Sequence, residues 1–306
     1  MSFDKFMQKT YIFTSLPDKP MSIRVVRKKR IMNRRFIVLK TLIVKKLGLL
    51  LLGGLLMLTA SGMDSVATAA GDGQPFHFGF KKSRNGELPS IAEEGFMDKL
   101  QEQGAVFLGD TSHKELYLTF DNGYENGYTG KVLDTLKQHK VPAAFFVTGH
   151  FVRDQPELLR RMADEGHIIG NHSWSHPDMT TLSAEQIRTE LDKVRETAGK
   201  ITGQSKMKYV RPPRGIFSGK VLKVCQEAGY TNVFWSAAYK DWDVQRQMGS
   251  NHAFRQVVSQ FHPGAVLLLH SVSKDNMEAL PSIIQAAQQQ GYTFKSLDEL
   301  QHKTYR

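Results

Sequence analysis

From residue 116 onwards, the chain alternates short apolar segments with longer amphipathic ones. The short segments are rich in β-branched and aromatic residues, which favours buried strands. They cover residues 116–120, 143–147, 168–170, 209–211, 233–237, 266–270 and 292–295. The longer segments place apolar residues three and four positions apart, which predicts helices. They cover residues 128–139, 156–165, 184–200, 219–228, 253–261, 277–290 and 297–302.

The ends of the helical segments carry the expected signals. Ser183 and Gln186 form a capping box at the start of one of them. Gly166, Gly229 and Gly291 follow three others, where a left-handed residue is favoured. Because each helical segment leads into the next strand-like one, the pattern predicts a parallel sheet, either open and doubly wound or closed as a barrel. Seven units rather than eight would leave a barrel incomplete or distorted.

Two segments precede this alternation. Residues 74–82 are rich in aromatic side chains, and we expect them to pack onto the rest of the protein as an arm. Residues 91–103 place apolar side chains at helical spacing. We therefore divide this part of the chain into an N-terminal arm, residues 71–110, and a main α/β domain, residues 111–306.

The net charge of +11 belongs to the beginning of the chain. Residues 1–46 contain 13 Lys and Arg but 2 Asp and Glu, and the remaining residues contain 28 of each sign. A balanced folded part gives no reason to propose a nucleic-acid partner. The single cysteine, Cys225, excludes an internal disulfide and a multi-cysteine zinc site.

The basic N-terminal part resembles an export signal. Residues 47–60 are apolar apart from Thr59 and are shorter than the roughly 20 residues of a spanning helix. Ala67 and Ala69 place small residues where a signal peptidase would cleave. We expect a basic extension at residues 1–31, with Met32 as an alternative start, and a signal peptide region at residues 32–70. If it is not cleaved, this leader would be the protein's contact with a membrane.

Polar side chains with catalytic chemistry follow several of the strand-like segments. His172 and His176 come after the third one and would lie on one face if they form a helical turn, so that both could bind one zinc or similar ion. Asp121 and Asn122 end the first. A carboxylate beside a metal site is a candidate general base, although Asp-Asn-Gly is equally typical of a turn.

Three further strand ends add an orienting cation and an acid. Arg211 begins the sequence Arg-Pro-Pro-Arg-Gly, in which the prolines stiffen the chain and leave Arg211 free to orient a carboxylate. Asp241 follows the fifth strand-like segment, and His270 ends the sixth. A buried Asp–His pair would keep the histidine protonated as a proton donor. Parallel strands end at one edge of a sheet, so we expect all five groups to converge.

These motifs resemble those of the NodB-like polysaccharide deacetylases, carbohydrate esterase family 4. They are Thr-Phe-Asp-Asn-Gly at 119–123, His-Ser-x-x-His at 172–176, Arg-Pro-Pro-Arg-Gly at 211–215, Asp-Trp at 241–242 and Leu-Leu-His at 268–270. The resemblance implies a distorted seven-stranded (β/α) barrel that hydrolyses N-acetyl amides of sugars with the help of a divalent metal. It also implies roles for single residues: Asp121 as general base, His270 as general acid, Arg211 and Asp241 as their partners, and His172, His176 and Asn122 as metal ligands.

Two residues depart from the usual family pattern. Asn122 stands where relatives have a second Asp. Because a neutral amide is a weaker ligand than a carboxylate, we expect a weakly bound metal. Arg214 stands where many relatives have an aromatic residue, and it suits a substrate with a carboxylate. Both departures resemble the Bacillus-type subgroup that deacetylates N-acetylmuramic acid in peptidoglycan during muramic-δ-lactam formation in the spore cortex.

The sequence thus predicts an exported peptidoglycan N-deacetylase that acts in the cell wall, or in the forespore intermembrane space and cortex. Arg214, Tyr124, Trp242 and His150 are the candidate substrate contacts. Two alternatives stay open: a deacetylase of chitooligosaccharides or other glycans, and a catalytically silent glycan-binding homologue.

Overall fold

The computed structural model describes residues 73–83 and 87–300. The expected basic extension, residues 1–31, and signal peptide region, residues 32–70, lie outside these ranges. Within them, none of the helices combines the length and the apolar character needed to span a bilayer.

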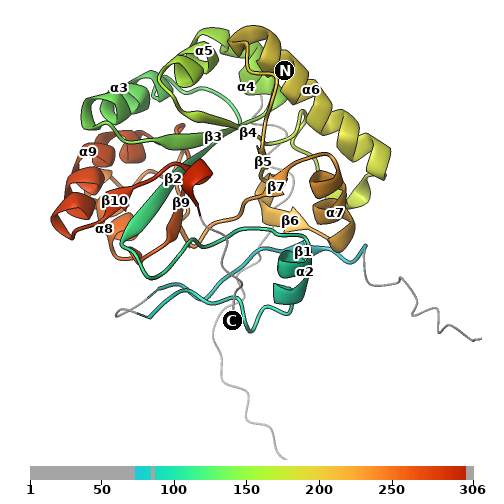
Figure 1. Ribbon diagram of the computed structural model, residues 1–306. Helices are drawn as coiled ribbons and strands as arrows, with labels where there is room; N and C mark the ends of the chain where they lie inside the picture. The colour runs from blue at the N-terminus through green and yellow to red at the C-terminus, as the bar shows by residue number, and fades with distance from the viewer. Residues whose placement is uncertain (1–72, 84–86, 301–306) are drawn as a thin grey trace, which may run out of the picture. The chain divides into compact units, whose positions relative to one another are not determined.

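The centre of the described chain is a curled parallel sheet (Figure 1). Seven strands follow one another in the order β7-β5-β4-β3-β2-β9-β8, and β10 pairs with the beginning of β2. Their bounds are β2 Glu115–Asn122, β3 Ala143–Val147, β4 Ile168–Asn171, β5 Tyr209–Val210, β7 Thr231–Asn232, β8 Ala237–Ala238, β9 Ala265–Leu269 and β10 Thr293–Phe294. The expected α/β fold with a distorted, incompletely closed seven-stranded barrel is confirmed.

The strand predicted at residues 233–237 was wrong in its limits. The chain pairs with β5 at 231–232 and with β9 at 237–238, and no ladder joins β7 to β8 within the described residues. The Val233 amide still donates to the Val210 carbonyl of β5 at 2.8 Å, but Val233 also forms an isolated bridge with Val106. The Phe234 amide donates to the Val106 carbonyl at 2.6 Å, outside the sheet. The barrel therefore stays open here, and the N-terminal segment lies against the opening.

The strand register places one edge of the sheet in line. Asn122 of β2 aligns with Val147 of β3, which aligns with Asn171 of β4, and Asn171 aligns with Val210 of β5. On the other side of β2, Phe120 aligns with Leu269 of β9. The residues that leave the sheet next, all at this edge, are His172, Arg211 and His270.

Helices cover the outer face of the curled sheet (Figure 1). They are α3 Thr129–His139, α4 Gly149–Asp154, α5 Pro156–Asp164, α6 Ala184–Thr202, α7 Gly219–Glu227, α8 Ser250–Val258 and α9 Lys274–Gln289. Short 3-10 turns lie at η1 Met179–Thr181, η2 Pro213–Gly215 and η3 Leu297–Glu299. Most helices match the predicted segments, but α4 was not expected, and α8 and α9 begin three residues early.

A side-chain cap explains the early start of α9, and a carboxylate of α9 holds the chain just ahead of α8. The Asp275 carboxylate accepts hydrogen bonds from the backbone amides of Met248 and Gly249, just ahead of α8. The Ser273 hydroxyl accepts one from the Asn276 amide in the first turn of α9. Such caps satisfy the unpaired amides of a helix start, and periodicity does not reveal them.

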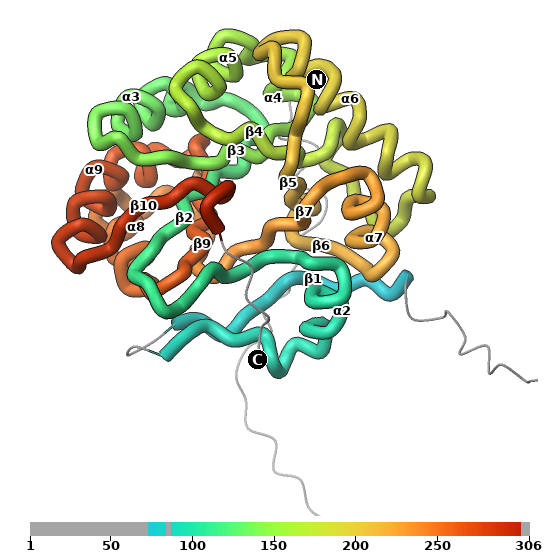
Figure 2. Tube along the Cα trace, viewed as in Figure 1, coloured from blue at the N-terminus to red at the C-terminus, as the bar shows by residue number. Residues whose placement is uncertain are grey.

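The N-terminal segment packs onto the domain through aromatic side chains. Strand β1 (Phe76–His77) pairs antiparallel with β6 (Ile216–Phe217), and Figure 2 follows the chain from there to α2 (Met97–Glu102). Phe78 stacks on Phe234 at a centroid distance of 4.5 Å, inside a buried cluster with Phe96 and Phe217. The packing of residues 74–82 expected from their composition is confirmed. Helix α2 is shorter than the helix predicted at 91–103.

Candidate active site

Arg211 is the buried cation at the edge of the sheet. Its side chain is fully enclosed, and it donates to Asp121 Oδ1 at 2.7 Å and to Thr119 Oγ1 at 3.0 Å. The carbonyls of Val233 and Phe234 accept two further hydrogen bonds, at 3.0 and 3.1 Å. These carbonyls belong to the segment that leaves the sheet between β7 and β8. The open part of the barrel therefore helps to hold the arginine in place.

Asp121 is a buried carboxylate between two positive or potentially positive groups. Its other oxygen, Oδ2, lies 3.5 Å from His172 Nε2. Burial alone would raise the pKa of Asp121, but the Arg211 cation, followed by His172 and His270, lowers it, and the net direction is downward. The side chain is thus held as a charged proton acceptor.

His270 and Asp241 form a second acid–base pair at the same edge. His270 Nδ1 lies 2.8 Å from Asp241 Oδ1, and Asp241 Oδ2 accepts the His270 backbone amide at 2.7 Å. Burial would lower the pKa of His270, but the Asp241 carboxylate outweighs it and the pKa is raised. With Nδ1 committed to Asp241, Nε2 is the nitrogen left for a reacting group.

The two histidines of His-Ser-x-x-His come together without a helical turn. Ser173 and His176 have left-handed backbone angles, with φ of 63° and 57°, and the segment is a loop. The helical turn considered for this segment is therefore wrong. The rings still meet, with centroids 4.9 Å apart, because the two left-handed residues fold the loop back on itself. The Ser173 hydroxyl stabilises this loop conformation by accepting a hydrogen bond from the His176 backbone amide at 3.1 Å.

Three atoms from the ends of β2 and β4 have the character of metal ligands. His172 Nδ1 faces the Arg211 carbonyl at 2.8 Å, so it is the protonated nitrogen and Nε2 is free to bind a cation. Burial lowers the pKa of His176 to about 3, and the charges of His172 and Arg214 act in the same direction, so the ring is neutral. The third atom is Asn122 Oδ1, which is buried without a hydrogen-bond partner.

These donors fit a divalent metal, but none of them carries a negative charge. Two neutral imidazoles and an amide oxygen suit zinc and related ions. No group of three or more His, Cys, Asp and Glu side chains suited to a metal occurs in the part of the chain that the structure describes. The unpaired amide oxygen is the observation in favour of a ligand, since buried polar atoms are normally satisfied.

The expected substrate contacts divide into two groups. Arg214 and Trp242 lie beside the acid–base cluster: Arg214 acts electrostatically on His176, and Trp242 follows Asp241 with 37% of its surface exposed. Tyr124 is half-buried two residues beyond Asn122. His150 lies on α4 with Nδ1 3.2 Å from the Asp154 carboxylate, one turn further along the same helix.

Several polar residues around the site were not assigned a role from the sequence. Asn276 of α9 donates to Asp241 Oδ2 and accepts from the Tyr239 hydroxyl, both at 2.5 Å. Ser271 accepts from Asn122 Nδ2 at 2.7 Å. Ser271 directly follows His270, and this position in the sequence could have identified it as a residue near the site. Nothing in the local sequence indicates that Asn276 and Tyr239 meet Asp241.

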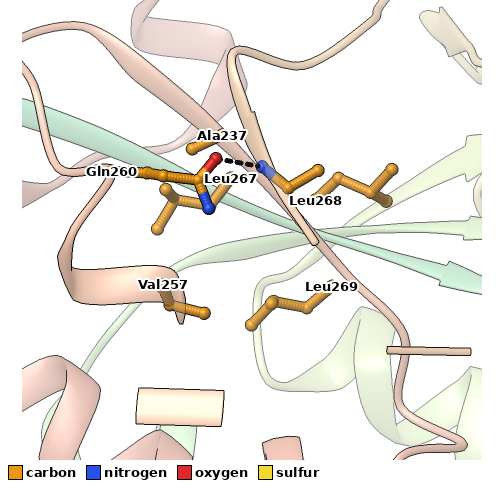
Figure 3. Close-up of a pocket in the computed structure, with 7 residues that line it drawn as sticks. Ala237, Val257, Gln260, Leu267, Leu268 and Leu269 are labelled. Atoms are coloured by element: carbon orange, nitrogen blue, oxygen red, sulfur yellow. Dashed lines mark hydrogen bonds between the residues drawn. The ribbon is translucent and has the colours of Figure 1, made fainter. Parts of the chain in front are cut away.

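The small hollow between β8, β9 and α8 is not part of this site (Figure 3). Leu267, Leu269 and Val257 line it, and its polar lining side chain, Gln260, accepts the Ala238 amide at 3.3 Å. A hollow with no converging polar groups offers nothing to a sugar or to an acetyl group.

Comparison with known proteins agrees with this geometry. Residues 108–233 match the polysaccharide deacetylase family model. The chain is 54% identical to the peptidoglycan-N-acetylmuramic acid deacetylase PdaA of Bacillus subtilis, over 74% of this chain and 86% of that protein. It is 54% identical to an uncharacterized 30.6 kDa protein of Geobacillus stearothermophilus, over 77% of this chain and 89% of that one.

Solved structures show the same fold. The structure of B. subtilis PdaA, a family 4 carbohydrate esterase, superposes with a TM-score of 0.73, covering 74% of this chain and 97% of that one. A family 4 carbohydrate esterase from Bacillus anthracis, 52% identical, gives a TM-score of 0.64 over 76% of this chain and 98% of that one. The chain belongs to the polysaccharide deacetylases of carbohydrate esterase family 4, which hydrolyse N-acetyl amide bonds.

Proposed function

We propose that this protein removes the acetyl group from N-acetylmuramic acid in peptidoglycan, as in muramic-δ-lactam formation in the spore cortex. The observation that carries this proposal is the meeting of a low-pKa carboxylate, Asp121, with a high-pKa imidazole, His270, at one edge of the sheet. Amide hydrolysis needs a base and an acid together. The similarity to PdaA supports the same substrate.

The protein groups have distinct parts in this reaction. Asp121 takes the proton from the attacking water, and Arg211 holds its carboxylate in position through the 2.7 Å hydrogen bond. His270 gives a proton to the amide nitrogen as it leaves, and Asp241 orients the imidazole and stabilises its charged form. Each of the two reacting groups thus has one fixed partner of opposite charge, so neither needs to reorganise during the reaction.

His172 Nε2, the His176 ring and Asn122 Oδ1 would hold a weakly bound divalent metal. When bound, such an ion polarises the acetyl carbonyl and lowers the pKa of a nearby water. These donors are neutral and compensate none of the charge of the ion, which weakens its retention.

Arg214 is the proposed recognition group for the lactyl carboxylate of muramic acid. Its exposed guanidinium lies close enough to affect His176 and is available to an anion at the site. Trp242 is 37% exposed, with Lys240 Nζ 4.9 Å from its ring centroid, and would contact a sugar with the remaining exposed surface, while Tyr124 and His150 would border the glycan.

The protein is proposed to act outside the cytoplasm, where peptidoglycan lies. Export would use the signal peptide region at 32–70, following the extension at 1–31, and would release the arm at 71–110 together with the catalytic domain at 111–306. N-terminal sequencing of the mature protein tests this division: a start close to residue 70 is expected, and a start at Met1 would contradict it.

Acetate release is the direct test of function. Peptide-stripped glycan strands that contain muramic acid should release acetate, and chelator should reduce the rate. Chitooligosaccharide as the better substrate would favour the alternative glycan deacetylase. Glycan binding without acetate release, with or without added Zn²⁺, would favour the silent homologue.

A further inference from the structure

The amide of Asn122 has two chemically different ends, and its orientation decides whether it can bind a cation. Nδ2 donates to Ser271 Oγ at 2.7 Å, and Oδ1 has no hydrogen-bond partner. The side chain is fully buried, so bulk water cannot hydrogen-bond to whichever end of the amide lacks a protein partner. If the amide turned by 180°, an NH₂ group would replace the oxygen and the third ligand atom of the metal site would be lost.

A row of hydroxyl groups leads from Ser271 to a carboxylate. Ser271 Oγ lies 2.8 Å from Thr129 Oγ1, at the start of α3, and both side chains are fully buried. The Thr129 hydroxyl in turn bonds to Glu125 Oε2, and the Thr129 backbone amide donates to Glu125 Oε1 at 3.2 Å. Each carboxylate oxygen of Glu125 therefore accepts one hydrogen bond from Thr129, Oε1 from the backbone amide and Oε2 from the hydroxyl.

The carboxylate fixes the direction of every hydrogen bond in this row. A carboxylate accepts and cannot donate, so the Thr129 hydroxyl must give its proton to Glu125. The Ser271 hydroxyl must then give its proton to Thr129, because Thr129 has no second one. Ser271 can therefore only accept from Asn122, which requires Nδ2 on that side.

We propose that Glu125, acting through Thr129 and Ser271, orients the Asn122 amide so that Oδ1 faces the metal ion. The three are positioning residues, and the proposal rests on the metal site of the proposed function. Second-sphere groups of this kind commonly change metal affinity by about 10-fold to 100-fold.

The same row explains why an amide stands at position 122 together with a carboxylate at 125. With Asn122→Asp alone, an oxygen without a proton would face Ser271 Oγ, whose proton is already given to Thr129. The carboxylate oxygen and Ser271 Oγ would then face each other as two acceptors with no proton between them, which is unfavourable in a buried site. Asn122 and Glu125 are therefore matched, and the gain in affinity from a charged ligand at 122 depends on residue 125.

Glu125→Gln should reverse the row. The Thr129 backbone amide keeps the Gln oxygen on its side, so the Gln NH₂ group faces the Thr129 hydroxyl and donates to it. Thr129 then donates to Ser271, and Ser271 donates to residue 122. Asn122 must turn its oxygen towards Ser271 and its NH₂ group towards the metal, whereas an aspartate at this position would accept from Ser271 and keep its other oxygen for the ion.

Calorimetric Zn²⁺ titration of the metal-free protein, without substrate, tests this with four proteins. They are the wild type, Glu125→Gln, Asn122→Asp and the double variant. We expect Glu125→Gln to bind Zn²⁺ at least tenfold more weakly than wild type. Asn122→Asp should raise affinity at least tenfold more in the Glu125→Gln background than in the wild-type background. Equal factors in the two backgrounds would overturn the proposal.

Asp110→Asn is the matched control for the loss of charge. Asp110 also accepts a backbone amide and a hydroxyl, both from Ser112, but Ser112 precedes the start of β2, whereas Asn122 lies at its end. We expect its Zn²⁺ affinity to stay within about threefold of wild type. A loss as large as that of Glu125→Gln would show that charge, and not orientation, is responsible.

A second pair of variants gives the same information if Glu125→Gln fails to fold. Thr129→Ser keeps the hydroxyl and should keep Zn²⁺ affinity, whereas Thr129→Val frees the Ser271 proton and should weaken binding about tenfold. Equal affinities of the two would contradict the proposal. If the wild type releases acetate but the effect of Asn122→Asp on Zn²⁺ affinity is the same in the wild-type and Glu125→Gln backgrounds, the orienting role of Glu125 is refuted and the proposed function stands. If that effect depends on residue 125 but no acetate is released, the orienting role stands and the proposed function is refuted.

Discussion

The Asp241 carboxylate holds His270 at two points, accepting the ring Nδ1–H at 2.8 Å and the backbone amide at 2.7 Å. The first bond sets the tautomer of the ring, and the second fixes the strand end that carries it. The Asp241 side chain is fully buried, while 21% of the His270 side chain is exposed. The pair thus combines a rigid, desolvated anion with an imidazole that can reach a substrate.

Asp241→Asn should move the alkaline side of the deacetylation pH profile to lower pH. The raised pKa keeps His270 protonated, and therefore able to act as an acid, at pH values where a free imidazole is already neutral. The acid form is lost as pH rises through that pKa, and removing the carboxylate lowers it. Measurement of kcat against pH checks this, with His270→Ala expected to lose about 10²-fold to 10⁴-fold in kcat. An unchanged alkaline limb in Asp241→Asn would refute this assignment.

Asn276→Ala should reduce kcat about tenfold with little effect on KM. The side chain links Tyr239 to Asp241 Oδ2 and does not belong to the proposed substrate contacts. Its loss leaves a buried carboxylate oxygen with one donor fewer, which costs about 1–3 kcal/mol of stability. Tyr239→Phe removes the outer bond alone and serves as the control, with a smaller loss. A change confined to KM would argue against a positioning role.

Asp121→Asn and Asp121→Ala should separate catalysis from stability. Both remove the proposed base and should abolish acetate release. The Asn variant keeps an oxygen for Arg211, whereas the Ala variant leaves that buried cation without its carboxylate. Both variants break the buried ion pair, which costs about 3–5 kcal/mol. Asp121→Ala also leaves the Arg211 N–H without an acceptor, so urea unfolding should show a further loss of about 1–3 kcal/mol for this variant. Residual turnover above about 1% in Asp121→Asn would exclude this carboxylate as the base.

Arg214→Ala should change substrate preference and leave the fold intact. Arg214 has a left-handed φ of 59°, and alanine carries the same backbone strain, so stability should change little. Turnover of glycan that contains muramic acid should fall by at least tenfold, and turnover of chitooligosaccharide, which lacks a carboxylate, should fall less. Comparison of kcat/KM for the two substrates checks this, and equal losses would remove the assigned role.

His262 should make the folded state sensitive to acid, at a distance from the catalytic groups. Its Nδ1 bonds to the Gln260 carbonyl and its Nε2 to the Ser236 hydroxyl, which accepts the Val266 amide. Because Nδ1 donates to the Gln260 carbonyl, the neutral Nε2 accepts from the Ser236 hydroxyl, and protonation requires this hydrogen bond to reverse. Burial, which disfavours the charged ring, lowers the pKa of His262 to about 4.

The sign of this effect follows from proton uptake. Below about pH 6.5 the unfolded chain binds a proton that native His262 refuses until about pH 4, so the free energy of unfolding falls over this range. The loss amounts to roughly 3 kcal/mol. Urea unfolding at several pH values should show it in the wild type and a flatter curve in His262→Asn. Parallel curves would contradict the assignment.

The sequence by itself determined the fold class and the members of the acid–base cluster. Period-two and period-3.6 patterns indicate which face of each element is buried, and parallel strands always present their carboxyl ends at one edge. Asp121, His172, Arg211 and His270 could therefore be placed together because each follows a strand-like run. The convergence is a property of β/α topology and needs no knowledge of side-chain contacts.

Tertiary structure decided the features that depend on contacts across long stretches of sequence. Between β7 and β8 the chain leaves β5 and pairs with Val106, whose amide donates to the Asn232 carbonyl and whose carbonyl accepts the Phe234 amide. The loop fold that joins the two histidines requires left-handed angles at Ser173 and His176, which a helical spacing rule does not anticipate.

The same division holds for the amide of Asn122. From the sequence, Asn122 stands where the family pattern has a carboxylate, and weak metal binding is the prediction that follows. Which end of that amide is free depends on the proton of Ser271, a residue 149 positions away, and through it on Glu125. Hydrogen-bond direction is set by the last acceptor in a buried row, and only the folded chain shows which residues form that row.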